Sequence, residues 1–107
     1  MSDTIQYLIL AEDLFDGLMD GTKCSTIRKG KRDVSLGPLV FLNNKEPGGG
    51  GYVVEVTDVE YKVHQDITDE DAQKDGFEST RDLFDKLREF YPDIDEKSIV
   101  TIIHFET

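Results

Sequence analysis

The segment 53–64 most constrains the fold, because it has the pattern of one long strand whose apolar positions change phase. An apolar set with period two lies at Val54 and Val56 and then moves to Val59, Tyr61 and Val63. Side chains alternate between the two faces of a strand, so a shift of one residue predicts a β-bulge or a sharp bend near residues 57 and 58. A bent strand of this length is typical of a small β-barrel.

Four shorter runs complete the predicted sheet: residues 4–10, 25–28, 38–42 and 99–105. The first is apolar and short enough for a strand buried on both faces, and the last fits a central strand. A glycine-rich stretch at 46–51 predicts a hairpin loop. We therefore predict an α+β fold, a small barrel of mostly antiparallel strands with two or three packed helices.

The helices are predicted from periodic apolar stripes and from their caps. One stripe closes at Gly21 and consists of Ala11, Leu14, Phe15, Leu18 and Met19. Two later helices begin with capping-box patterns, Thr68 with Asp71 and Ser79 with Asp82. The second of these ends at Pro92, and its stripe is Leu83, Phe84, Leu87, Phe90 and Tyr91.

The length and composition limit the class of protein. A chain of 107 residues predicts one domain, residues 1–107, which we expect to be a monomer. Its single cysteine, Cys24, excludes an internal disulfide and favours a reducing cytoplasm. No apolar run approaches the ~20 residues that span a bilayer, so no membrane is expected. The net charge of −11 argues against a broad surface that coats nucleic acid.

Against this acidity, residues 23–32 carry five of the twelve basic side chains and none of the twenty-three acidic ones. The segment holds +5 and the rest of the chain −16. Like charges repel, so such a cluster favours a site for an anionic ligand, although an exposed basic turn that aids solubility explains it about equally well. The residues assigned to ligand binding are Gly21, Lys23, Thr26, Arg28, Lys29, Lys31 and Arg32.

Within that segment, an extended backbone places Cys24, Thr26 and Arg28 on one face and Ile27 on the other. Ile27 is then expected in the core, with Thr26 and Arg28 facing outward. An arginine binds a phosphate or a carbonyl oxygen bidentately, and a threonine hydroxyl donates or accepts a hydrogen bond. Lys23 is a general base only if burial or neighbouring cations lower its pKa.

The pattern Gly-x-Lys-x-x-Thr-x-Arg at 21–28 resembles the signature of the ASCH domain family, which is related to the PUA-like RNA-binding domains. Residues 66–77 and 102–106 are also similar to stretches of that family. The resemblance implies a compact β-barrel that recognises RNA or a nucleotide in a cleft lined by the motif. We expect no cofactor and no metal.

A narrower resemblance is to small bacterial members that hydrolyse N4-acetylcytidine to cytidine and acetate with lysine, threonine and glutamate. The first two roles fall on Lys23 and Thr26, and the third falls on Asp75, which is one methylene shorter than glutamate. Some relatives are described as ribonucleases. A third interpretation is an interaction protein whose acidic surface docks a basic protein partner.

Other residues have simpler explanations. A catalytic Cys24 lacks a histidine placed to serve it, and the histidines fit a strand end at His64 and a packed position at His104. The carboxylates at 69–71 suit the first turn of a helix without a metal. Two tyrosines, Tyr7 and Tyr52, are candidates for stacking on a base.

Overall fold

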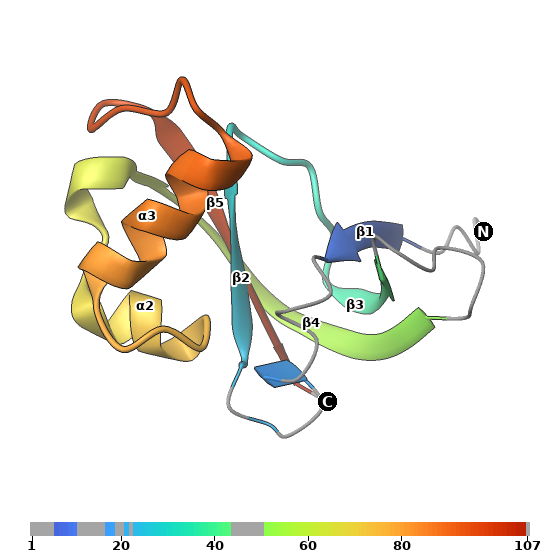
Figure 1. The fold of residues 1–107 in the computed structure, drawn as a ribbon. Helices are drawn as coiled ribbons and strands as arrows, with labels where there is room; N and C mark the ends of the chain where they lie inside the picture. The colour runs from blue at the N-terminus through green and yellow to red at the C-terminus, as the bar shows by residue number, and fades with distance from the viewer. Residues whose placement is uncertain (1–5, 11–16, 19–20, 22, 44–50, 107) are drawn as a thin grey trace.

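The computed structural model describes residues 6–10, 17–18, 21, 23–43 and 51–106. Within these residues one curled sheet is flanked by helices (Figure 1). The elements are β1 (Gln6–Leu10), β2 (Ser25–Lys29), β3 (Gly37–Asn43), β4 (Gly51–Val63), the 3-10 helix η1 (His64–Asp66), α2 (Asp69–Lys74), α3 (Thr80–Phe90) and β5 (Ile99–Glu106). This is the predicted α+β class, with the sheet forming an open half-barrel.

The five strands lie in the order β1-β3-β4-β5-β2, so β1 and β2 are the two edges. The pair β1–β3 is parallel and the other three pairs are antiparallel, as the mostly antiparallel prediction required. In β4 the register against β5 shifts between Val56 and Asp58. The change of phase read from the sequence is therefore a β-bulge, and it lies where the long strand changes partner from β3 to β5.

The sheet carries a hydrophobic core on each face. One core contains Ile27, Val100 and Ile102 of the sheet, and it packs against α2 and α3 through Ala72, Leu83 and Leu87. The other lies inside the curl and contains Leu10, Leu18, Leu39, Phe41, Val54, Val56, Ile103 and Phe105. Strand β5 contributes to both cores, which confirms the prediction of a central strand at 99–105. The predicted core position of Ile27 is also confirmed.

The prediction for β1 was wrong in one respect. Tyr7 and Ile9 are 57% exposed, while Leu10 is buried, so the strand is not covered on both faces. The physical reason is its place at the edge of the sheet, where within the described part of the chain only its inner face meets a core. A continuous apolar run is compatible both with a strand buried on two faces and with an edge strand that exposes apolar side chains.

Helix α2 is capped at both ends by its own sequence. The Thr68 hydroxyl accepts from the Asp71 amide and the Asp71 carboxylate accepts from the Thr68 amide, which is the predicted capping box. At the other end the Gly76 amide donates to the Gln73 carbonyl, and the Phe77 amide donates to the Ala72 carbonyl. This Schellman arrangement needs a left-handed residue, and Gly76 has φ +89°.

Helix α3 begins and ends near its predicted boundaries. The Ser79 hydroxyl accepts from the Asp82 amide at 3.5 Å, and the helix ends at Phe90, two residues before Pro92. Most of the predicted helix 11–19 and of the loop 46–51 lies outside the described residues. Leu18 is helical and buried, and Gly21 has the expected positive φ of +83°. None of the helices described here is long and apolar enough to cross a membrane.

Candidate functional site

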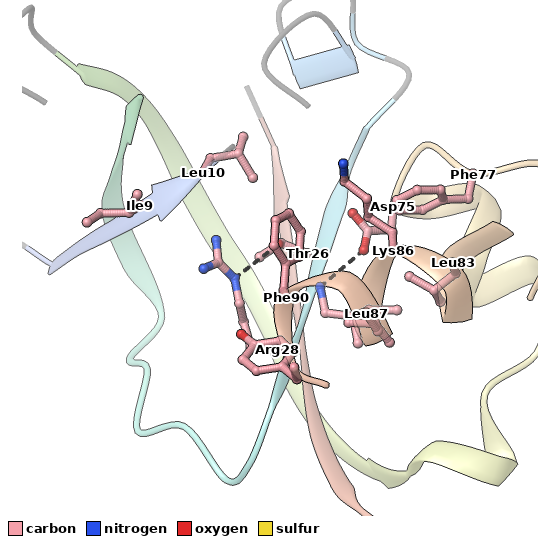
Figure 2. Close-up of a pocket in the computed structure, with 12 residues that line it drawn as sticks. Ile9, Leu10, Thr26, Arg28, Asp75, Phe77, Leu83, Lys86, Leu87 and Phe90 are labelled. Carbon is pink, nitrogen blue, oxygen red and sulfur yellow. Dashed lines mark hydrogen bonds between the residues drawn. The ribbon is translucent and has the colours of Figure 1, made fainter. Parts of the chain in front are cut away.

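A cavity of about 240 Å³ opens between the edge strand β2, the C-terminal end of α2, helix α3 and strand β1 (Figure 2). Four polar side chains line it, those of Thr26, Arg28, Asp75 and Lys86. Its apolar walls are Ile9, Leu10, Ile27, Phe77, Leu83, Leu87, Phe90 and Tyr91. An apolar pocket with a few converging polar groups is the usual form of a small-ligand site.

Asp75 is placed in the cavity by the end of α2 and by the free edge of β2. It is the C-cap residue of α2, immediately before the left-handed Gly76. Its Oδ2 accepts from the Ile27 amide at 3.2 Å. Since β2 is an edge strand, this amide needs a partner from outside the sheet, and the aspartate supplies it. Asp75 is 5% exposed.

Lys23 lies behind Asp75, away from the cavity lining, and is only 2% exposed. Its ammonium forms an ion pair with the Asp75 carboxylate, and Nζ also donates to the Asp75 backbone carbonyl at 3.3 Å. The pKa of Lys23 is lowered from 10.5 to about 7, mainly by burial and also by the charge of Arg28, while Cys24 opposes the shift. The sequence motif therefore contains a lysine that can change protonation near neutral pH.

Thr26 and Arg28 share one face of β2, as predicted, but that face is not directed into solvent. Thr26 is 3% exposed, and Arg28 Nε donates to Thr26 Oγ1 at 3.4 Å (Figure 2). The expectation that both face outward was wrong for Thr26, because the neighbouring elements fold over this edge of the sheet. Arg28 Nη2 is buried and has no hydrogen-bond partner among the described residues.

The electrostatic environment of Arg28 combines three contributions. Burial lowers its pKa most, Tyr91 raises it through its charge and a side-chain hydrogen bond, and the charge of Arg32 lowers it. Arginine remains protonated in proteins, so the consequence is a partly desolvated cation beside the cavity. Such a group binds an acceptor or an anion more strongly than an exposed arginine does, because less water must be displaced.

The remaining residues assigned to ligand binding do not line the cavity. Gly21, the first residue of the motif, is exposed in a turn. Lys29 forms an ion pair with Asp93 at 2.9 Å, and the Lys31 ammonium lies 5.3 Å from the centre of the Tyr61 ring. Arg32 reaches the Tyr91 hydroxyl through Nη2 at 3.4 Å. The structure thus brings Lys23, Thr26, Arg28 and Asp75 together and leaves the other cations outside.

Sequence reasoning missed part of the cavity wall. Phe90 and Tyr91 were assigned to the core stripe of α3, but they lie at its last turn and line the cavity together with Phe77 and Lys86. Phe90 is 44% exposed, which a core residue would not be. The available signal was their position at the very end of the stripe, where a helix stops covering the sheet. Tyr7 and Tyr52, the predicted stacking residues, are not in the lining.

The secondary candidates lie outside the cavity. Cys24 is exposed, and His104 contacts Glu60 at 2.7 Å. His64 is buried and stacks on Phe84, with the ring centres 4.0 Å apart. No group of three or more side chains suited to holding a metal occurs among the described residues.

Neither a protein-family model nor a curated protein matches this sequence. Solved structures do match. An ASCH domain from Lactobacillus crispatus superposes with a TM-score of 0.77 at 14% identity, covering 96% of this chain and 79% of that chain. The fold is that of the ASCH domain. The resemblance inferred from the motif is therefore confirmed at the level of the fold.

Two further structures have the same ASCH fold. A protein of a domain family of unknown function from Enterococcus faecalis matches with a TM-score of 0.78 at 11% identity, over 100% of this chain and 77% of that one. A tyrosine-to-phenylalanine variant of an ASCH protein from Zymomonas mobilis matches with a TM-score of 0.65 at 9% identity, over 96% and 69%. At identities this low the similarity shows the fold alone, and a shared fold does not determine function.

Proposed function

We propose that this protein binds a nucleoside or a single nucleotide, free or within RNA, with the base in the cavity beside β2. The observation that carries the proposal is the buried Nη2 of Arg28, which has no hydrogen-bond partner among the described residues and belongs to a side chain that lines the cavity. A buried donor without a partner is costly, and a ligand acceptor would satisfy it. The oxygen and nitrogen acceptors of a base match a guanidinium.

The cavity walls suit a flat ring. Phe77, Phe90 and Tyr91 provide aromatic surface, and stacking on such side chains contributes about 1–3 kcal/mol per base. The volume of about 240 Å³ is small for a ligand pocket, which favours a single base with part of its sugar.

The charges favour a small ligand over a long RNA surface. Two of the five cations in the basic segment are held by carboxylates, Lys23 by Asp75 and Lys29 by Asp93. Few cations therefore remain for phosphates, and the acidic remainder of the chain repels a polyanion. Affinity should fall with salt along a shallow slope, corresponding to one or two neutralised phosphates.

The test is a calorimetric and NMR titration with the four ribonucleosides and N4-acetylcytidine. Arg28→Met keeps the aliphatic stem and should weaken binding by roughly tenfold or more, the value of a hydrogen bond from a charged group. Arg88→Met is the matched control, because Arg88 is an exposed arginine of α3 that does not line the cavity. Equal affinity in a folded Arg28→Met protein, or amide shifts away from residues 23–28 and 75–91, would contradict the proposal.

A second candidate function, hydrolysis of the N4-acetyl amide, is favoured by a separate observation. Lys23, with a pKa of about 7, is paired to Asp75, and Asp75 and Thr26 line the same cavity. In this reaction Thr26 attacks the acetyl carbon or positions water, Lys23 accepts the proton, and Asp75 holds Lys23 in place. Water is consumed, the carbon–nitrogen bond breaks, and the base amine and acetate are released.

The hydrolysis is tested by following acetate release by NMR. The pH profile of kcat/KM should rise with an apparent pKa near 7, since Lys23 must lose its proton to act as a base. Thr26→Val and Lys23→Met should abolish turnover, whereas Asp75→Glu tests whether the longer carboxylate increases it. Binding without acetate would leave a binding module. Turnover that survives both Thr26→Val and Lys23→Met would disprove the assignment.

The third interpretation, an acidic module for a basic protein, gives a different result in the same titrations. None of the nucleosides would then bind, and reversal of acidic surface charges would abolish partner capture.

A further inference from the structure

Two arginines interact with Tyr91 of the cavity wall, and neither forms an ion pair with a carboxylate among the described residues. Arg28 lines the cavity together with Tyr91, and Arg32 Nη2 lies 3.4 Å from the Tyr91 hydroxyl. In the same chain Lys29 and Lys62 are both paired with aspartates. Because twenty-three acidic residues are available, an unneutralised pair of guanidinium groups is a distinct feature of this surface.

Four hydrogen bonds fix the loop around Arg32, three of them made by Arg32 and one by Gly30. Its amide donates to Thr101 Oγ1 at 2.8 Å, and its Nε donates to the Lys29 carbonyl at 2.9 Å. The Tyr61 hydroxyl donates to the Arg32 carbonyl at 2.8 Å, and Thr101 Oγ1 donates to the Gly30 carbonyl at 2.7 Å. Thr101 is fully buried on β5, so the loop is tied to the centre of the sheet.

These contacts hold Arg32 near enough for its charge to lower the pKa of Arg28. Holding like charges together is unfavourable until an anion lies between them. Arg28 Nε donates to Thr26 and its Nη2 is assigned to the base, which leaves Nη1 of Arg28 and the terminal nitrogens of Arg32 for phosphate oxygens. The Tyr91 hydroxyl adds a neutral donor at the same place.

We propose that Arg28, Arg32 and Tyr91 form a phosphate subsite at the rim of the cavity, so that the ligand is a phosphorylated nucleotide. The proposal rests on the proposed function for the position of the base. It adds the class of ligand: a nucleoside monophosphate or one nucleotide of an RNA strand, bound in preference to the bare nucleoside.

The experiment compares each ribonucleoside with its 5′- and 3′-monophosphates, and with inorganic phosphate alone, by calorimetry at low salt. One of the two monophosphates should bind roughly tenfold more tightly than its nucleoside, the value of a charge-assisted contact. Arg32→Ala should remove that preference, so that the monophosphates bind no more tightly than their nucleosides. Arg81→Ala, which removes the same charge from an exposed position on α3, is the matched control and should keep the preference.

The outcomes separate the two proposals. Nucleosides that bind as tightly as both monophosphates, in the presence of intact Arg32, overturn the phosphate subsite and leave the proposed function standing. Inorganic phosphate that binds as tightly as the monophosphates and does not compete with nucleosides also overturns the subsite, because the anion is then bound independently. Failure of every nucleoside and nucleotide to bind overturns the proposed function, and the subsite with it.

Discussion

The two ends of helix α2 each carry an aspartate paired with a lysine, and the two pairs behave in opposite ways. At the N-terminal end Lys62 contacts Asp71 at 2.7 Å, with 27% and 10% of the side chains exposed. At the C-terminal end Lys23 contacts Asp75, with 1% and 5% exposed. The hydrogen bond that Lys62 donates to the Asp71 carboxylate raises the pKa of Lys62, whereas the pKa of Lys23 is lowered to about 7, mainly by burial.

The difference shows that burial, more than the identity of the partner, decides what an ion pair does. In the Lys62–Asp71 pair the lysine remains partly hydrated, with 27% of its side chain exposed, and the pair connects β4 to α2. The Lys23–Asp75 pair is buried away from water, so each charge depends on the other for stabilisation. Because the pKa of Lys23 is about 7, a large fraction of this lysine is deprotonated at physiological pH. The first pair joins two elements near the surface, and the second lies in the interior with a lysine whose pKa is about 7.

The largest expected effect is from Asp75→Ala. It leaves the Lys23 ammonium buried without a counter-charge and the Ile27 amide without an acceptor, so the free energy of unfolding should fall by about 3–5 kcal/mol. Urea unfolding followed by circular dichroism measures this. Adding Lys23→Met to Asp75→Ala should restore much of the loss, and no restoration in the double variant would argue against a dependent pair.

The pH dependence of stability sharpens the comparison next. The pKa of Lys23 is about 7 in the folded protein and 10.5 when unfolded, so the unfolded chain binds the extra proton between these values. The free energy of unfolding should therefore gain from Lys23 as pH rises through that window, with a slope approaching 1.4 kcal/mol per pH unit, a rough upper value. The pKa of Lys62 is raised in the folded protein, so the stability that Lys62 contributes is lost only as pH rises through this raised pKa.

This second prediction is checked by urea unfolding at pH 7, 8, 9 and 10. A Lys23→Met, Asp75→Asn double variant should lose the rise, because it removes the titrating amine and its partner together. An unchanged slope in that variant would mean that another group titrates.

At the N-terminal end, Asp71→Ala removes one half of the capping box and the partner of Lys62. The expected loss is about 1–2 kcal/mol, less than at Asp75, because water replaces the lost contacts with Lys62 and with the Thr68 amide. Asp71→Asn keeps the side-chain acceptor for the Thr68 amide and should recover part of it. Thermal unfolding of the two variants side by side distinguishes the cap from the charge.

The smallest expected effect is from Lys62→Ala, about 0.5–1 kcal/mol, because Lys62 is partly exposed and the Asp71 carboxylate keeps its hydrogen bond from the Thr68 amide. The measurement is again urea unfolding, at low and at high salt. A loss comparable to that of Asp75→Ala would remove the distinction between the two ends of the helix.

Much of the fold was predictable because it depends on local patterns. The alternation along β4 located the bulge at residues 56–58, and the capping residues Thr68 and Ser79 located the starts of α2 and α3. The exposure of β1 was not predictable, because an apolar run looks the same at the edge of a sheet and at its centre. The site was predicted in part: the motif supplied Lys23, Thr26 and Arg28, and the resemblance supplied Asp75, but neither indicated Phe90 or Tyr91 as walls.

The sequence by itself determined which residues carry charge and hydroxyl groups, and the spacing that places Thr26 and Arg28 on one face of a strand. The tertiary structure decided which of the cations are available. Lys29 and Arg32 are three residues apart in one basic segment, yet one is neutralised by Asp93 and the other lies at the cavity rim. It also decided that Lys23 loses its water against Asp75, fifty-two residues away. The physical reason is that desolvation and pairing depend on distances across the fold, which no local pattern encodes.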